Sequence, residues 1–156
     1  MPSPRDLNSN DPYDLDRFVQ AQSADYERAL AELRAGEKRS HWMWYIFPQI
    51  EGLGHSSMSR RYSIKSAAEA RTYLDHPILG PRLRECAAVV NGIARRSALE
   101  IFGSPDDMKL LSCATLFARV SHEGVFNQLI QKYFDGQPDK ETLRLLNSPT
   151  DTSVTA

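Results

Sequence analysis

The segment SPDDMKLLSCATLFARV, residues 104–120, constrains the fold most tightly, because it predicts a helix that is apolar on most of its surface. Its start has Ser104 as a predicted N-cap, Pro105 at the first helical position and two carboxylates in the first turn, where the helix dipole favours them. Beyond that turn, apolar side chains cover most sides of the helix. A helix of this kind is expected to lie near the centre of a domain.

The other periodic segments predict helices that pack around this one. A first helix is expected between Asp14, as its N-cap, and Gly36, which stands where a terminating glycine would. A capping box of Ser66 and Glu69 predicts the start of another, and further apolar stripes follow between residues 80 and 146. No strand pair or hairpin pattern competes. We therefore predict an all-α fold, a single compact domain of five or six helices around a central buried helix.

Composition divides the chain into a folded unit and two tails. Residues 1–13 and 147–156 are rich in Pro, Ser, Asn, Asp and Thr and have no apolar period, so both are predicted to be flexible tails around one domain, 14–146. The 156 residues are enough to form a hydrophobic core that needs no disulfide or metal ion to stabilise it. No run approaches the roughly eighteen apolar residues of a membrane span, and no signal core is present, which predicts a cytoplasmic protein without a membrane partner.

Charge and motif content argue against several functions. With 19 basic and 20 acidic side chains, the formal net charge is −1, so nucleic acid is not an expected partner, although a local basic patch is compatible with this charge. No metal site is predicted, because the four histidines lack the spacing of zinc ligands. No cofactor is predicted either, since neither GxxxxGK[ST] nor GxGxxG occurs. Cys86 and Cys113 lie among apolar residues and are expected to be buried thiols.

The stretch KRSHWMWYIFPQIEGLGHS, residues 38–56, is the main candidate for a functional segment. A core could use its aromatic rings, but it has little use for His41, Gln49 or the basic pair that includes Arg39. His41 is a candidate acid or base near neutral pH, or else a ring packed between aromatic neighbours. Trp42 and Trp44 could stack on a planar ligand, or they could fill the core. Both interpretations can hold for different rings.

The loop that follows carries groups suited to an anion. Gly52 and Gly54 permit close approach of the backbone, Ser57 belongs to a serine pair that can cap a helical turn, and Arg61 supplies positive charge. The alternative is a tight turn that joins two helices. The central helix adds Lys109 and Ser112, whose polar groups need partners; Lys109 could reach solvent or a carboxylate, or face a cavity that an anion fills.

Three long segments of the chain closely resemble one bacterial family. They are RFVQAQSADYERALAELRAGEKRSHWMWYIFPQIEGLGHSSMSRRYSI, EARTYLDHPILGPRLREC and FGSPDDMKLLSCATLFA. The family is known as domain of unknown function eighteen-ten, and some of its members carry the label calpastatin, although nothing here resembles the repeated inhibitory segments of the animal protease inhibitor. The resemblance implies a compact, mainly helical single domain and brings no established reaction.

Two functional hypotheses follow. The first is a small-molecule site for a nucleotide-like or other anionic ligand, such as an ADP-ribose derivative, with His41 as the candidate catalytic residue. Its predicted ligand-binding residues are Arg39, Trp42, Trp44, Gln49, Gly52, Gly54, Ser57, Arg61, Lys109 and Ser112. The second is a non-catalytic protein-interaction domain that docks through the aromatic segment 41–49. A concave pocket favours the first hypothesis, whereas a flat, exposed aromatic patch favours the second.

Overall fold

The computed structural model describes residues 10–147 and confirms a mainly helical, single-domain fold. Within these residues, six helices have seven or more residues: α2 (Asp16–Arg34), α5 (Ala67–Asp75), α6 (Leu79–Asn91), α8 (Asp106–Val120), α9 (Gly124–Phe134) and α10 (Lys140–Leu146). Three further helices are shorter: α3 (Met43–Ile46), α4 (Ser57–Arg61) and α7 (Ala98–Phe102). The predicted number of helices therefore covers only the longer ones, because four or five residues are too few to show a helical period.

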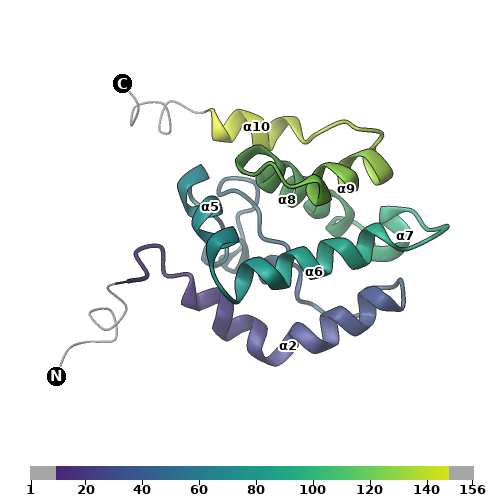
Figure 1. The fold of residues 1–156 in the computed structure, drawn as a ribbon, viewed down its shortest axis with the longest axis horizontal. Coiled ribbons are helices and arrows are strands. Elements are labelled where there is room, and N and C mark those ends of the chain that lie inside the picture. The colour runs from purple at the N-terminus through teal and green to yellow at the C-terminus, as the bar shows by residue number, and fades with distance from the viewer. Residues whose placement is uncertain (1–9, 148–156) are drawn as a thin grey trace.

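Most of the contacts between helices involve α6 or α8. In Figure 1, α6 crosses between α2 on one side and α8 with α9 on the other. Every side chain from residue 110 to residue 117 of α8 is buried, and this helix packs against α5, α7, α9 and α10. No helix within residues 10–147 combines the length and apolar character needed to cross a bilayer.

The start of α2 differs from the prediction. Asp14 is not the N-cap; it has a positive φ of 53° and precedes Leu15, which holds the cap position. The carboxylate of Asp11 takes the capping role instead, because it accepts hydrogen bonds from the backbone amides of Leu15 at 2.7 Å and Asp16 at 2.9 Å. The predicted tails lie mostly outside the described residues, and Asp11 belongs to the short part of residues 1–13 inside them.

The start of α8 also requires a correction. Its helix begins at Asp106 with Pro105 at the cap position, and Ser104 makes no capping hydrogen bond. The physical reason is that the amide of Asp107, which an N-cap serine would bond, donates to the carbonyl of Gly103 at 2.8 Å. The two predicted carboxylates, Asp106 and Asp107, do lie in the first turn.

A parallel β-bridge between Ile50 and Ile64 closes a loop that contains α4. The amide of Ile64 donates to the carbonyl of Gln49, and the amide of Glu51 donates to the carbonyl of Ile64, each at 2.8 Å. Both isoleucines are buried. The bridge thus fixes the base of a loop, residues 51–63, which we call the α4 loop.

Candidate functional site

Glu32 of α2 anchors the beginning of the aromatic segment. Its carboxylate accepts hydrogen bonds from the amides of Arg39 and Ser40, from the Ser40 hydroxyl and from Trp42 Nε1, over distances of 2.6 to 2.9 Å. The sequence gives no sign of this role, because an acidic residue on the polar face of a helix does not reveal partners in a later loop. The side chain of Glu32 therefore determines how residues 39–42 leave α2.

Glu32 is also expected to make stability depend on pH. Burial raises its pKa, but the hydrogen bonds from Ser40, Arg39 and Trp42 outweigh burial and hold the pKa at about 2, below its usual 4.5. A carboxylate with a depressed pKa stabilises the fold above its usual pKa, and that contribution is lost as the pH falls toward 2. We expect Glu32→Gln to have a lower free energy of unfolding than the wild type at pH 7. Between pH 4.5 and 2, the free energy of unfolding should fall less in the variant than in the wild type. Denaturant melts of both proteins at pH 7, 4.5 and 2 measure this, and an acid dependence of Glu32→Gln equal to that of the wild type would contradict the role of Glu32.

The two tryptophans have different environments. Trp42 is fully buried, at 0% exposure, and packs near Phe47 with 6.3 Å between ring centroids. A ligand that comes from solvent therefore cannot stack on Trp42 in this conformation, although the sequence predicted that role. Trp44 is only half-buried, and Lys109 Nζ lies 5.3 Å from the centroid of its ring. Of the two indoles, Trp44 is the one that a ligand could reach.

Lys109 belongs to an ion cluster at the start of α8. Its Nζ lies 3.4 Å from Asp106 Oδ1, while Lys38 Nζ lies 2.9 Å from Asp106 Oδ2 and 5.0 Å from the Trp42 centroid. Asp106 thus pairs with both lysines. Asp106 is therefore the carboxylate partner that was one of the predicted alternatives for Lys109.

Four of the predicted residues meet at one small cavity. Trp44, Gln49, Gly52 and Gly54 line a space of about 20 Å³, together with residues of the α4 loop that include Arg60. That volume is roughly what one water molecule needs. In this conformation the cavity cannot hold a nucleotide.

Both glycines of this loop are required by packing. Gly52 has a positive φ of 107°, and a Cβ there would approach Leu145 of α10 at 3.1 Å. A Cβ at Gly54 would lie only 2.5 Å from the Ser59 hydroxyl oxygen. The glycines therefore permit tight contacts within the protein, which differs from the predicted approach to an anion.

The other predicted residues lie apart from this cavity. His41 and Arg39 are exposed, and Arg39 Nε lies 3.5 Å from Glu37. Ser57 is the exposed first residue of α4, whose cap is Ser56. Ser112 is buried and donates to the carbonyl of Met108 at 3.1 Å. These four residues are not brought together with Trp44 and Gln49.

A larger hollow adjoins the α4 loop near the start of α2. It has a volume of about 550 Å³ and opens to solvent. Its lining residues are Pro12, Tyr13, Asp14, Arg17, Arg60, Arg61, Lys65 and Glu69. Arg61 is the predicted site residue among them, and Arg60 also lines the small cavity. The two spaces are therefore neighbours that share one lining residue. We call the larger space the basic hollow.

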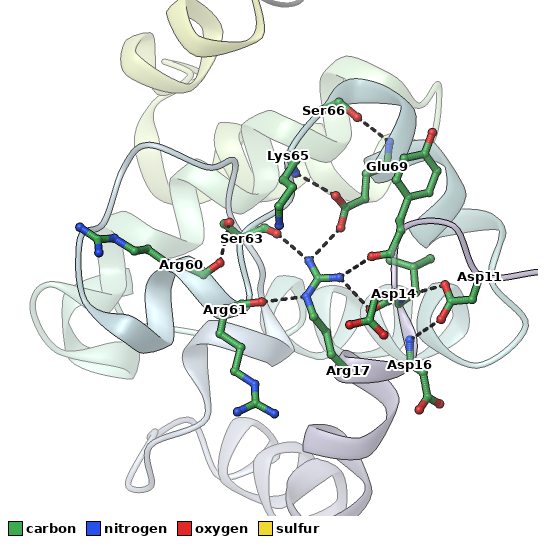
Figure 2. Close-up of polar contacts among 12 residues, drawn as sticks. Asp11, Asp14, Asp16, Arg17, Arg60, Arg61, Ser63, Lys65, Ser66 and Glu69 are labelled. Atoms are coloured by element: carbon green, nitrogen blue, oxygen red, sulfur yellow. Dashed lines mark hydrogen bonds and ion pairs between the residues drawn. The ribbon is translucent and has the colours of Figure 1, made fainter. Parts of the chain in front are cut away.

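Arg17 forms the floor of the basic hollow and uses all five of its N–H donors there, as Figure 2 shows. Nε donates to the carbonyl of Arg61 at 2.7 Å, and Nη1 donates to those of Tyr13 and Asp14 at 2.6 and 2.8 Å. Nη2 donates to the carbonyl of Ser63 at 2.7 Å and to Glu69 Oε2 at 2.9 Å. This network joins the start of α2 to the end of the α4 loop and to α5.

Glu69 completes that floor. Its side chain is 1% exposed, and its Oε1 accepts the amide of Lys65 at 3.0 Å. The predicted capping box is therefore half formed, since Ser66 accepts the amide of Glu69 at 3.1 Å but the Glu69 carboxylate bonds Lys65 and Arg17 instead of returning to Ser66. The charge of Arg17 is thus matched by a buried carboxylate.

Three cations at the rim of the basic hollow have no such partner. Arg60, Arg61 and Lys65 are exposed, and none of them forms an ion pair with a carboxylate in the part of the chain that the structure describes. Arg61 lies 5.5 Å above the ring of Tyr62. In Figure 2 the side chains of Arg60 and Arg61 extend away from the Arg17 guanidinium in different directions. Long exposed side chains of this kind can reorient toward a ligand.

Other reactive groups do not form a site of their own. Burial raises the pKa of Cys86 to about 12 and the pKa of Cys113 well above its usual range, and both are free thiols. Neither thiol is therefore a nucleophile near neutral pH. Within residues 10–147, no three His, Cys, Asp or Glu side chains gather closely enough to hold a metal ion.

These features define a small helical single-domain protein with a basic hollow beside a short, exposed helix. The chain belongs to the family described as protein of unknown function (DUF1810), whose model matches residues 12–146. It is similar to the crystal structure of the conserved hypothetical protein Rv1873 from Mycobacterium tuberculosis, with 52% sequence identity and a TM-score of 0.87. The similarity covers 88% of this chain and 99% of that one. No curated protein matches the chain.

Proposed function

We propose that this protein binds a small anionic molecule of nucleotide size in the basic hollow. The observation that carries the proposal is the set of three rim cations, Arg60, Arg61 and Lys65, which line a space of about 550 Å³ and have no carboxylate partners in residues 10–147. Small-molecule sites generally occupy about 300–1,000 Å³. The volume of the hollow and its positive charge therefore both suit an anion of nucleotide size.

The charges at the hollow indicate a ligand with more than one negative charge. Arg17 and Glu69 neutralise each other, and Asp14 offsets only one of the three rim cations. A phosphate ester or a diphosphate would balance the remaining positive charge, and arginine forms paired hydrogen bonds with phosphate oxygens. An ADP-ribose derivative combines a diphosphate with nucleotide size, so it belongs to the proposed class.

The alternative, a protein-interaction domain, gains less support. It requires aromatic side chains of residues 41–49 at the surface, whereas the rings of Trp42, Tyr45 and Phe47 are buried, with at most 7% exposure. Only Trp44 is partly exposed among the aromatic residues of that segment. His41 stays a predicted acid or base and does not line the basic hollow.

Isothermal titration calorimetry with ADP and with pyrophosphate tests the proposal. We expect both to bind, and we expect the double variant Arg61→Gln/Lys65→Gln to bind pyrophosphate at least about 100-fold more weakly, because each charge-assisted hydrogen bond is worth roughly 1.5–3 kcal/mol. Raising the salt concentration should also weaken binding to the wild type.

Arg119→Gln is the matched control, since Arg119 is exposed on α8 and does not line the basic hollow. It removes a positive charge of the same kind and should leave the dissociation constant nearly unchanged. If the double variant binds as tightly as Arg119→Gln, or if the wild type binds neither compound at millimolar concentration, the proposed function is wrong.

A further inference from the structure

The α4 loop is held firmly at its base and weakly at its tip. The base has the bridge between Ile50 and Ile64, and Arg17 binds the carbonyls of Arg61 and Ser63. By contrast, no residue of α4 is buried, and α4 is not among the helices that pack extensively against one another. A segment with few buried contacts opens at low free-energy cost.

This weakly held tip covers the half-buried Trp44. The small cavity is lined by Trp44, Gln49 and Ile50 together with the α4 loop, which contributes Gly54, Ser59 and Arg60 among others. The α4 loop supplies most of the residues that line this water-sized cavity. Displacing α4 would expose an indole ring beside a side-chain amide.

We propose that α4 is a flap over a second subsite, in which a planar heteroaromatic ring stacks on Trp44 and the Gln49 amide bonds its polar edge. The inference rests on the proposed function, because it places the ring of the same ligand whose anionic group occupies the basic hollow. Arg60 lines both spaces, so one molecule can extend from one to the other. The ligand class is thereby narrowed to a heteroaromatic ring joined to a phosphate or diphosphate.

The chemistry of the covered residues supports this class. An indole ring can stack on any nucleobase, and a side-chain amide can both donate a hydrogen bond to the edge of such a ring and accept one from it. Lys109 Nζ already lies 5.3 Å from the Trp44 centroid, which holds that ring in place from the side of α8. A ligand ring would therefore meet an indole whose position is already set.

Acrylamide quenching of tryptophan fluorescence tests the flap directly. The chain has two tryptophans, and Trp42 has 0% exposure, so quenching of the folded protein reports Trp44. We expect saturating ADP to lower the quenching constant at least about twofold, because a stacked ring covers one face of the indole. Pyrophosphate should leave the constant unchanged. Trp44→Phe, as the control, should remove the ligand-sensitive quenching.

Gly54→Ala tests the mobility of α4 without any ligand. The added Cβ would lie 2.5 Å from Ser59 Oγ and 2.7 Å from Ser59 Cβ, so residue 54 and Ser59 of α4 have to move apart. We expect acrylamide to quench the tryptophan fluorescence of this variant with a larger quenching constant than that of the wild type. The control Gly124→Ala adds a methyl group whose nearest neighbour is 3.7 Å away. Its quenching constant should equal that of the wild type.

The outcomes separate the two proposals. If ADP and pyrophosphate both bind through Arg61 and Lys65 but ADP leaves Trp44 quenching unchanged, the flap subsite is wrong and the basic hollow stands. If neither compound binds, both proposals fail. Unaltered quenching in Gly54→Ala would also overturn the flap, independently of any ligand.

Discussion

Replacing Arg17 by methionine is expected to lower the free energy of unfolding by about 3–5 kcal/mol, the range for breaking a buried ion pair from one side. The variant leaves Glu69 charged at 1% exposure, and it removes the donors from four backbone carbonyls. The loss should appear in denaturant melts followed by circular dichroism. Because the network joins α2 to the end of the α4 loop, the variant should also lose the contacts that hold these two segments together at the basic hollow.

Arg28→Met is the matched control for this change. Arg28 also pairs with an acidic residue, Asp25, but its side chain is 60% exposed, so its removal should change stability by no more than about 0.5 kcal/mol. The double variant Arg17→Met/Glu69→Met should recover part of the loss, since it leaves no buried charge without a partner. A cost for Arg17→Met as small as that of Arg28→Met would show that the five-donor network does not stabilise the fold.

Truncating Trp42 to alanine is expected to cost about 3–5 kcal/mol, as for other buried aromatic residues. Trp42 has 0% exposure, and its indole N–H donates to Glu32 at 2.9 Å, so the change leaves a cavity and removes one anchor of the aromatic segment. Trp44→Ala should cost clearly less, because that ring is only partly buried. Denaturant melts of both variants measure the difference.

A reversed order, with Trp44→Ala the more destabilising, would mean that the tryptophan at the α4 loop is the main core residue. That result would also remove the basis for the flap subsite, because a ring essential to the core is not available to a ligand. Far-ultraviolet circular dichroism of each variant before melting confirms that both still fold.

Sequence patterns predicted the long helices because those helices bury one face with a regular period. The stripe of α2, for example, includes Phe18, Gln22 and Tyr26, all of which are buried. Helix starts were harder to predict, since a cap depends on which nearby group reaches the free amide first. Asp11 rather than Asp14 caps α2, and the carbonyl of Gly103 takes the amide that Ser104 would have capped.

The candidate site was predictable only in part. The glycine loop and Trp44 with Gln49 were identified because aromatic and glycine residues stand out locally, and the structure does bring them to one cavity. The pairing of Arg17 with Glu69 spans 52 positions, so no local pattern reveals it. Trp42 and Trp44 could not be ranked either, since neighbouring residues on one short helical turn point in different directions and only the packing decides which is buried.

The most direct test of the proposed ligand site is a titration of the isotopically labelled protein with ADP, followed by two-dimensional amide NMR. Amide signals that shift should belong to residues around the basic hollow, chiefly 12–17 and 60–69, and extend to Trp44 and Gln49 if the flap opens. Shifts confined to another surface, such as the hollow lined by Arg71, Arg84 and His122, would contradict the account, as would the absence of any shift at saturating ADP.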